Sequence, residues 1–472
     1  MKELSSIVDG RFVITDDTNS EALDTYSHDI SPFPKTQPLV VVKPHSALEV
    51  SKILELANKA KTPVLPFGSA YSFTGLSNRR PKKTIVIDMK AMNKVVEINE
   101  SNMSVTAECG IIVGNLSDAV KERGFLINTV SVPFYKDTLG GMISGVIGGG
   151  YSLHSSSNGL NNRHILNLKV VLPNGQIVDT AGRGANISAK SQQMRETNCP
   201  DITGLFIGDG GSFGVKVEST LAMYPLPTRS ISGSYFFENL PKAWSALSRL
   251  MEARPLLYDT VVILGPSLTK IYTMEEEEHR WSLAYYIHGF DSHVEIRNNQ
   301  LKQIVTSESC SVGNELLEEF AAGLRTGEPF WGESAKFADS LVRRASIPFF
   351  IDKSYFLETF LKIKNFIENS VENERRSGID LATGYIIRPI LQTTVWGNLN
   401  IYYYTNEHKD VVLRILKEAY LMAVGAGASL EPHGGFAADV MGANWSSSLR
   451  FLFRQIKTSL DPCNILNPDL WG

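Results

Sequence analysis

Three glycine-rich stretches of this chain have residue types and spacings that suggest a ligand-binding site. They span residues 63–75, 138–150 and 201–215, and each follows a hydrophobic run typical of a β-strand. Glycine has no side chain, so the backbone N–H groups of such loops can approach an anion closely. Three loops of this kind indicate a long ligand that carries phosphates, and they predict a dinucleotide site.

The common nucleotide-binding fingerprints do not account for these glycines. In the third stretch Gly208 and Gly210 are correctly spaced for Gly-x-Gly-x-x-Gly, but Phe213 occupies the position of the last glycine. No stretch reads Gly-x-x-x-x-Gly-Lys followed by Ser or Thr. The glycines therefore belong neither to a Rossmann fingerprint nor to a P-loop.

The ordered set of stretches resembles the flavin domain of the vanillyl-alcohol oxidase and p-cresol methylhydroxylase superfamily, in its branch of glycolate oxidase and D-lactate dehydrogenase subunits. The resemblance runs through nearly the whole chain and implies a bound FAD. Besides the glycine stretches, it rests on residues 26–29, 42–46, 86–90, 166–175 and 461–468.

The chain length also predicts more than one domain, because 472 residues exceed what one hydrophobic core usually spans. The resemblance implies an α+β fold, a two-domain flavoprotein with a split FAD-binding domain and a cap domain that forms the substrate pocket. We expect the FAD-binding domain, with two α+β subdomains, at residues 1–227. The cap domain then covers residues 228–429, and residues 430–472 return to the FAD-binding domain.

Local patterns predict the elements that position the glycine stretches. Ser46 and Glu49 form a capping box, and the hydrophobic spacing after them predicts a helix to about Lys59. Gly124 predicts the end of a helix that begins at Asn115. Strand patterns occupy residues 62–66, 84–88 and 95–107 in the first domain, and 281–288 and 398–404 in the cap. Helical patterns of the cap occupy residues 243–253, 295–305 and 354–374.

The resemblance implies which residues bind FAD. The first stretch binds the pyrophosphate, the second lines the ribityl chain and ring, and the third holds the ribose and adenine. Some relatives attach the flavin to a histidine where this chain has Tyr71, so we expect non-covalent FAD, and Ala70 replaces a family glycine. The expected FAD-binding residues are Phe67, Gly68, Ser69, Ala70, Tyr71, Ser72 and Gly75; Pro133, Thr138, Gly140, Gly141, Ser144 and Gly145; and Gly208, Asp209, Gly211, Gly214 and Val215.

The segment Glu431-Pro-His-Gly resembles the Glu-His-Gly segment of the D-2-hydroxy-acid enzymes. In those enzymes the histidine takes the hydroxyl proton as hydride passes to the flavin, a task that suits an imidazole with a pKa near ~6.5. His433, with Glu431 near it, is therefore the expected base, although Pro432 interrupts the family's Glu-His pair. The alternative is a structural role for His433.

Residues 395–400 align with a family segment that is flanked by metal-binding histidines. Asn400 stands where the second histidine would be, Thr393 lies near the position of the first, and Trp396 replaces an aspartate. Neutral amide and hydroxyl oxygens hold a divalent transition metal poorly. We therefore expect no bound metal.

A carboxylate substrate needs a cationic side chain to bind it. Arg343 and Arg344 lie where the family places carboxylate-binding residues, and Arg388 is a further candidate. Arginine offers two parallel N–H donors to a carboxylate. The alternative for each arginine is an ion pair with an acidic side chain at the domain boundary.

The leading interpretation is an FAD-dependent dehydrogenase of D-2-hydroxy acids such as D-lactate, which passes electrons to a quinone or another carrier rather than to NAD. The missing metal ligands and the aromatic residues 402–404 keep open an enzyme that oxidises phenolic or other alcohols. A non-enzymatic flavoprotein, or a subunit of an electron-transfer complex, is the third interpretation.

The composition of the chain limits the classes of binding partner and the cellular compartment that we expect for the protein. The balance of 46 Lys and Arg against 50 Asp and Glu argues against a nucleic-acid partner. The first ten residues lack a signal-peptide pattern, and no apolar run approaches the ~20 residues that a bilayer requires. We expect a cytoplasmic protein, with peripheral membrane association and a homo-oligomer left open. The four cysteines lack a metal-binding spacing, so we expect free thiols.

Overall fold

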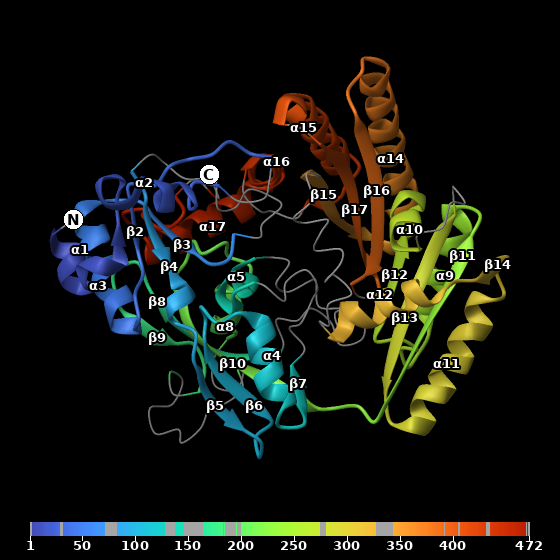
Figure 1. The fold of residues 1–472 in the computed structure, drawn as a ribbon, viewed down its shortest axis with the longest axis horizontal. Helices are drawn as coiled ribbons and strands as arrows, with labels where there is room; N and C mark the ends of the chain where they lie inside the picture. Colours follow the sequence, from blue (N-terminus) through green and yellow to red (C-terminus); the bar gives the residue numbers. More distant parts are fainter. Residues whose placement is uncertain are drawn as a thin grey trace.

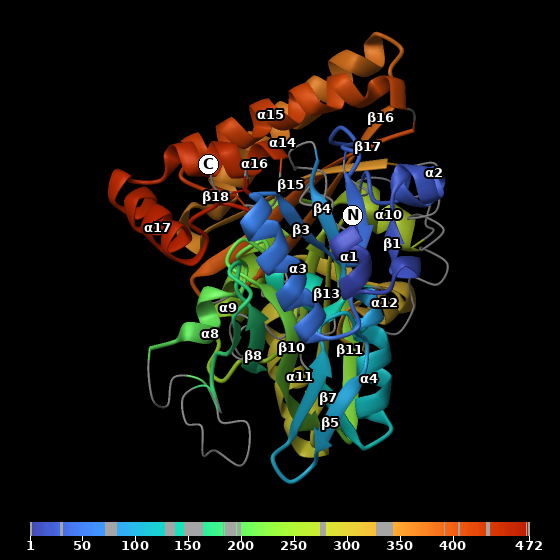
Figure 2. The same ribbon diagram turned by 90° about the vertical axis from the view of Figure 1, so that its left-hand side faces the viewer.

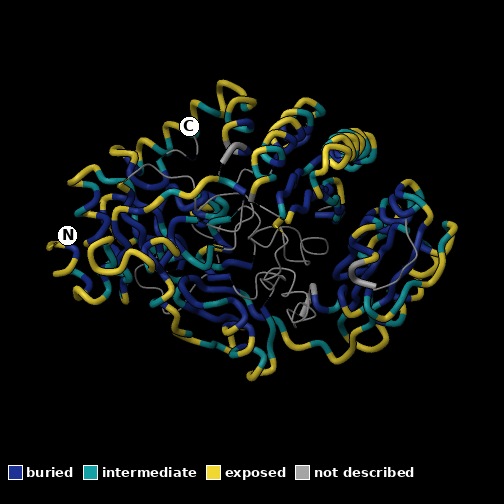
Figure 3. Tube along the Cα trace, turned by 45° about the horizontal axis from the view of Figure 1, so that its top comes forward, coloured by how far each residue is buried: buried dark blue, intermediate teal, exposed yellow. Residues whose placement is uncertain are grey.

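The computed structural model has two parts that lie side by side (Figure 1). The first part contains two sheets and the N-terminus, and the second contains one large sheet flanked by long helices. Buried residues fill the interior of both parts (Figure 3). The structure describes residues 2–28, 32–70, 83–127, 137–145, 164–182, 184, 195, 200–273, 280–326, 343–390, 392–404, 406–430, 435–468 and 470.

The first sheet is small and mostly parallel. Strands β2 and β3 run parallel to β4 on either side of it, and β1 pairs with β2 in antiparallel. The predicted helix after Ser46 is α3, and the Ser46 hydroxyl accepts from Glu49 N at 3.2 Å; the Glu49 carboxylate accepts from His45 N at 2.7 Å rather than from Ser46 N, so only half of the predicted capping box forms. The elements are α1 (Lys2–Ile7), β1 (Val13–Ile14), α2 (Asp16–Asp24), β2 (Val40–Val42), α3 (Ala47–Ala60), β3 (Val64–Phe67) and β4 (Ile85–Asp88).

The other sheet of the first part is antiparallel, with the order β5-β6-β10-β8-β9, and β7 also pairs with β10. The alternating run predicted at 95–107 forms its first two strands, β5 and β6. Gly124 follows α4 with a φ of 80°, a left-handed conformation that favours glycine, as predicted for a helix end. The elements are β5 (Val95–Asn99), β6 (Ser104–Glu108), α4 (Val113–Lys121), β7 (Phe125–Ile127), α5 (Leu139–Ser144), β8 (Ile165–Val171), β9 (Ile177–Asp179), α8 (Ile202–Leu205) and β10 (Val215–Pro225).

The core of the first sheet includes residues from both ends of the sequence. Leu4 and Ile53 pack there with Ile465 and Leu466. The segment that contains Leu466 also lies alongside β3: Val64 N donates to Ile465 O at 2.7 Å, and Asn467 N donates to Val64 O at 3.1 Å. This segment therefore extends the first sheet beside the strand that leads into the first glycine stretch.

The second part is built on one large sheet, which we call the second sheet, with the order β14-β11-β13-β12-β16-β17-β15-β18. Its larger core lies under α9, α11, α14 and α15, and a smaller core lies under α10 and α12 on the other face. Helices α14 and α15 run side by side (Figure 2). The predicted helices and strands of the cap are present as α9, α11, α14, β13 and β17. The strands are β11 (Arg229–Phe237), β12 (Thr260–Leu264), β13 (Trp281–Gly289), β14 (Cys310–Val312), β15 (Arg343–Asp352), β16 (Leu381–Pro389), β17 (Thr394–Tyr403) and β18 (Ser429–Leu430). The helices are α9 (Leu240–Glu252), α10 (Pro266–Thr273), α11 (Asp291–Val305), α12 (Glu315–Thr326), α14 (Lys353–Arg376) and α15 (Lys409–Gly425).

The structure places the return to the first part later than residue 430. Leu430 pairs with Phe349 in the second sheet, and Ala437 and Val440 of α16 (Gly435–Asn444) pack in the core of that sheet. The next helix, α17 (Ser447–Leu460), packs instead against a core of the first part. The first crossing lies between β10 and β11, close to the expected boundary at residue 227.

Two sequence expectations concern the whole chain. None of the helices in the described ranges combines the length and apolar character needed to cross a bilayer. Cys109, Cys310 and Cys463 are free thiols, as expected, and Cys199 lies outside the described residues.

Candidate functional site

The described parts of the three glycine stretches meet in the first part of the molecule. The second and third stretches are joined by two hydrogen bonds: Gly208 N donates to Ile143 O at 2.9 Å, and Gly210 N donates to Ser144 O at 2.8 Å. The first and second stretches meet at Gly68, where a Cβ atom would lie 2.1 Å from the Thr138 hydroxyl oxygen. Only glycine fits at this contact, so the close approach of the two loops depends on it.

The first stretch offers backbone donors to a ligand. Gly68, Ser69 and Ala70 are half-buried, and among the described residues their N–H groups have no hydrogen-bond acceptor. Ala70 adopts a φ of 59°. This left-handed conformation costs a residue with a Cβ about 1 kcal/mol and would be easier for the glycine that the resemblance implies here. Three successive free donors form the kind of concavity that binds a phosphate.

The second stretch differs from our expectation in the use of its N–H groups. Gly140 N donates to Cys109 O at 2.7 Å, and Gly141 N donates to the Thr138 hydroxyl at 3.3 Å. These two groups are therefore bonded within the protein. Helix α5 buries Leu139, and a Cβ atom at Gly140 would lie 3.0 Å from Cys109 Cβ while one at Gly141 would lie 2.9 Å from the Thr138 hydroxyl oxygen, so these glycines allow close packing within the protein.

The side chain of Asp209 folds the third stretch instead of extending toward a ligand. Its carboxylate is buried and accepts from Gly211 N at 2.9 Å and Phe213 N at 3.1 Å, and it forms an ion pair with Lys216. Burial lowers the pKa of Lys216, and the charge of Asp209 opposes this shift. Gly208 and Gly211 both have positive φ, which explains the need for glycine in this tight turn.

Three further expected FAD-binding residues serve packing. The ring of Phe67 lies against Tyr26, with 5.0 Å between the ring centroids. A Cβ at Gly214 would lie 2.3 Å from a methyl carbon of Val170, and the side chain of Val215 is buried in the core of the first sheet. Phe67, Gly214 and Val215 therefore contribute to the packing that supports the glycine stretches.

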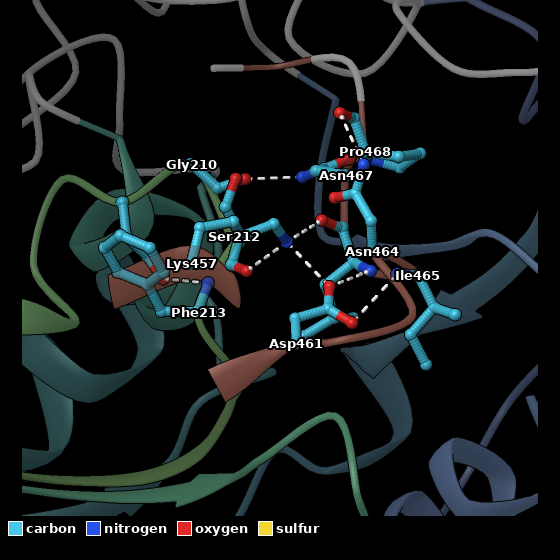
Figure 4. Close-up of polar contacts among 11 residues, drawn as sticks. Gly210, Ser212, Phe213, Lys457, Asp461, Asn464, Ile465, Asn467 and Pro468 are labelled. Atoms are coloured by element: carbon cyan, nitrogen blue, oxygen red, sulfur yellow. Dashed lines mark hydrogen bonds and ion pairs between the residues drawn. The ribbon is translucent and has the colours of Figure 1, made fainter. Parts of the chain in front are cut away.

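A lysine that the sequence analysis missed holds the third stretch in place (Figure 4). Lys457 Nζ, on α17, donates to Ser212 O at 2.8 Å, to Leu466 O at 2.7 Å and to the Asp461 carboxylate at 2.7 Å. Asp461 also accepts from two backbone N–H groups, and the Asn467 amide donates to Gly210 O. We call Lys457, Asp461 and Asn467 the C-terminal clamp. The i,i+4 spacing of Lys457 and Asp461 is visible in the sequence, but their contact with Ser212 is not.

Several candidate residues lie outside the described residues. They are Tyr71, Ser72, Gly75, Pro133, Glu431 and His433.

Most of the remaining candidate residues that the structure describes lie on one face of the second sheet. Along β17, Leu399 and Ile401 pack in the core under the long helices, so the alternate residues lie on the opposite face, which we call the inner face. Helix α12 packs on part of the inner face and lies on the side nearer the first part in Figure 1. The inner-face residues of β17 are Trp396, Asn398, Asn400 and Tyr402.

The structure separates the two adjacent arginines of β15. Neighbouring residues of a strand face opposite ways, so Arg344 lies on the inner face and Arg343 on the other. Arg344 forms a side-chain hydrogen bond with Tyr402, whereas Arg343 acts electrostatically on His28 and Tyr403. Arg343 and Arg344 therefore face different surroundings, although both were candidates for carboxylate binding.

Arg388 lies at a different place on the inner face. It pairs with Trp396 across β16 and β17, is 6% exposed, and places its guanidinium carbon 5.7 Å from the Trp396 ring centroid. Arg344 pairs with Tyr402, six residues further along the strand, which corresponds to roughly 20 Å. Arg344 and Arg388 therefore belong to separate places on the face.

Asn400, at the expected position of a family histidine, is fully buried and bonded within the sheet. Its carboxamide accepts from the Ser346 hydroxyl at 2.7 Å and donates to Gly384 O at 3.3 Å. Thr393 is exposed at the start of β17. These residues form no metal-binding group, and the absence of a metal stays a prediction.

A family model described as an FAD binding domain matches residues 38–181. The chain carries an FAD-binding domain. Its described residues fit the cofactor, because the N–H groups of Gly68 to Ala70, which have no acceptor among the described residues, suit the pyrophosphate. The matched residues lie in the first part of the molecule, against which α17 also packs.

The curated relatives of the FAD-binding domain are dehydrogenase and oxidase subunits. The chain is 28% identical over 239 residues to the glycolate oxidase subunit GlcD of Bacillus subtilis, covering 51% of this chain and 48% of that protein. It is 29% identical over 279 residues to the mitochondrial D-lactate dehydrogenase (cytochrome) of Arabidopsis thaliana, covering 58% and 46%. The chain thus spans about half the length of these relatives. With the Kluyveromyces lactis D-lactate dehydrogenase it is 24% identical over 97% of this chain and 78% of that protein.

Solved structures confirm the fold. The 4-ethylphenol oxidase from Gulosibacter chungangensis superposes with a TM-score of 0.82 at 17% identity, over 100% of this chain and 96% of that chain. The p-cresol methylhydroxylase with substrate bound gives a TM-score of 0.79 at 16% identity, with coverages of 100% and 96%. The α+β fold that the sequence resemblance implied is therefore the fold of this chain.

Asp137 joins the first two stretches of the FAD-binding domain. The Ser69 hydroxyl donates to its carboxylate at 2.6 Å, and the carboxyl group is buried. Burial raises the pKa of Asp137 to about 7, although the bond from Ser69 acts in the opposite direction.

We expect Asp137→Asn to stabilise the apoprotein at about pH 8 and much less at about pH 5. The pKa of Asp137 in the folded state lies above its unfolded value of 3.8, so the native protein loses stability as the pH rises from there to about 7. This rise in the pKa of Asp137 corresponds to a loss of about 4 kcal/mol at most, which the neutral amide avoids. Urea unfolding of both proteins at the two pH values measures the difference. A difference that does not change with pH would contradict this prediction.

Proposed function

We propose that the protein is an FAD-dependent oxidoreductase that oxidises a D-2-hydroxy acid, of the D-lactate type, to the 2-oxo acid. The observation that carries the substrate class is the nearly buried Arg388 guanidinium on the inner face of the cap. A buried guanidinium favours an anion with two parallel acceptors, such as a carboxylate. The names of the glycolate oxidase and D-lactate dehydrogenase relatives support the same class.

Three of the candidate residues take a role in this proposal. Arg388 binds the carboxylate, and His433, with Glu431 near it, takes the hydroxyl proton. Bound FAD supplies the hydride acceptor. The position of β18 supports this pairing: His433 follows Leu430 by three residues, and Leu430 pairs with Phe349, next to the Phe350 that pairs with Trp396. Arg343 has no role, because it lies on the other face.

The remaining partners are also proposals. A quinone or another non-NAD carrier accepts the electrons, and the protein acts in the cytoplasm, with peripheral membrane association and a homo-oligomer left open. No nucleic acid takes part, in keeping with the formal charge of −4.

A second candidate function is the oxidation of a phenolic or other alcohol, as in the vanillyl-alcohol oxidase group. The observation that favours it is the pair of Arg344 and Tyr402 on the inner face, where the Tyr402 side chain is buried and hydrogen-bonded to Arg344. A cation beside a phenol group stabilises a phenolate.

An anaerobic titration separates these functions. The purified yellow protein is mixed without oxygen with D-lactate, and separately with a 4-alkylphenol, and the flavin absorbance band is followed. Bleaching by D-lactate supports the proposed function, and bleaching by the phenol alone replaces it with the second candidate. Bleaching by neither, extended to a panel of hydroxy acids and alcohols, favours a non-enzymatic flavoprotein.

We expect the protein to release all of its FAD on acid precipitation, because Tyr71 replaces the histidine that attaches the flavin in some relatives. The released FAD is measured in the supernatant by absorbance. Colour that stays with the denatured protein would show a covalent bond through another residue.

We expect treatment with EDTA to leave the anaerobic reduction rate unchanged. The Asn400 carboxamide is hydrogen-bonded within the sheet, and Thr393 offers only one exposed hydroxyl group. Neither residue can therefore replace an imidazole ligand. The rate is measured before and after dialysis against the chelator. Loss of activity that zinc or manganese restores would reveal a metal site built from other residues.

A further inference from the structure

Asn398 is a buried polar side chain in the middle of the inner face. It is 1% exposed, and its Oδ1 has no hydrogen-bond partner among the described residues. Its neighbours across the sheet are Pro348 and Ile386, whose side chains carry no donor. A buried carboxamide without a partner destabilises the folded state, so this side chain indicates a ligand that is bound during function.

Asn400 provides the comparison on the same strand and the same face. Two residues along β17, its carboxamide is bonded at both ends, to the Ser346 hydroxyl and to Gly384 O. The Asn400 carboxamide therefore has hydrogen-bond partners within the sheet. The Oδ1 atom of Asn398 has none among the described residues. The difference sets Asn398 apart from a residue that only stabilises the sheet.

Asn398 lies next to Arg388 on the inner face. Arg388 pairs with Trp396, and Asn398 is two residues beyond Trp396 on β17. Such diagonal positions lie roughly 7–8 Å apart between neighbouring strands, within reach of the long arginine side chain. A 2-hydroxy acid has its hydroxyl group on the carbon next to its carboxylate. A carboxylate on Arg388 therefore brings the hydroxyl group near Asn398.

We infer that the Asn398 carboxamide binds the hydroxyl group of the substrate and selects hydroxy acids over unsubstituted acids, an inference that rests on the proposed function. The amide can turn to present either its N–H or its C=O group. An N–H donated to the hydroxyl oxygen leaves the hydroxyl proton free for a base. Asn398 thus supplies through a neutral hydrogen bond the orientation that a metal ion supplies elsewhere.

The first test needs no substrate. Asn398→Leu and Asn400→Leu are compared by thermal unfolding of the FAD-loaded proteins. Because Asn398 Oδ1 has no hydrogen-bond partner among the described residues, replacing Asn398 should keep or raise the Tm, whereas Asn400→Leu should lower the Tm by leaving the Ser346 hydroxyl and Gly384 O unpaired. An equal fall in both variants would overturn the inference, since it would show that Asn398 has a structural role.

The second test measures selection of the hydroxyl group. Stopped-flow reduction by D-lactate gives the rate constant of flavin reduction divided by the dissociation constant of D-lactate. Propionate lacks the hydroxyl group, and its inhibition of this reduction gives an inhibition constant at the same site. In Asn398→Leu we expect the ratio for D-lactate to fall about 10- to 100-fold and the inhibition constant of propionate to stay unchanged. An unchanged ratio, or an equal loss for both ligands, would remove Asn398 from hydroxyl recognition.

The two failures can be told apart. If D-lactate and other 2-hydroxy acids do not reduce wild-type FAD, the proposed function falls and the hydroxyl assignment falls with it. If D-lactate reduces the wild type and Asn398→Leu equally well, only the assignment of Asn398 falls.

Discussion

Replacing His433 with alanine is expected to leave FAD bound and to slow anaerobic flavin reduction by D-lactate ~10²- to 10⁴-fold, the range typical of a lost general base. FAD binding survives because the free donors of the cofactor site are at Gly68 to Ala70, far from His433 in the sequence. Stopped-flow reduction of FAD-loaded protein at saturating substrate measures the rate.

His293→Ala is the matched control, because His293 is an exposed histidine on α11. It should reduce at the wild-type rate. If His433 only packs its segment, the His433 variant should lose stability or FAD while the remaining loaded enzyme is reduced normally. An unchanged rate in the loaded His433 variant would remove this residue from the mechanism.

Lys457→Met is expected to lower the free energy of unfolding by roughly 3–5 kcal/mol and to weaken FAD retention. The lysine is 14% exposed and its partner Asp461 is fully buried, so the substitution leaves a buried carboxylate without its cation. The carbonyl groups of Ser212 and Leu466 lose a donor as well. Urea unfolding and the FAD fraction that remains after gel filtration measure the two effects.

Arg376→Met controls for the loss of an ion pair with the same i,i+4 spacing. Arg376 and Glu372 are 74% and 51% exposed, so their pair contributes at most about 0.5 kcal/mol. Equal stability losses in the Lys457 and Arg376 variants would mean that the C-terminal clamp does not hold the third glycine stretch.

Local signals in the sequence were sufficient for much of the first domain. The Ser46 N-cap and the helix end before Gly124 depend on contacts within a few residues, and both are present. The three glycine stretches could be predicted as one site because glycine at such positions reports on the backbone itself. Hydrogen bonds between these loops and distant parts of the sequence could not be predicted. Nothing near Gly140 in the sequence shows that its N–H donates to Cys109 O.

The pair Arg343 and Arg344 shows a second limit. Read as a basic pair they predict one site, but in a strand they face opposite ways, and the sequence analysis did not identify β15. The later return to the first domain was missed for a related reason. The packing of Ala437 and Val440 depends on partners in α15 and the second sheet, which no local pattern contains.

The shared core of the first sheet has a consequence for biosynthesis. A ribosome makes Leu4 and Ile53 early, but Ile465 and Leu466, which complete their core, emerge only after the entire second sheet. Domains fold as units during translation, so the cap domain can fold while the flavin half still lacks a layer of its interior. The core of the first sheet therefore closes only after the cap domain has been synthesised.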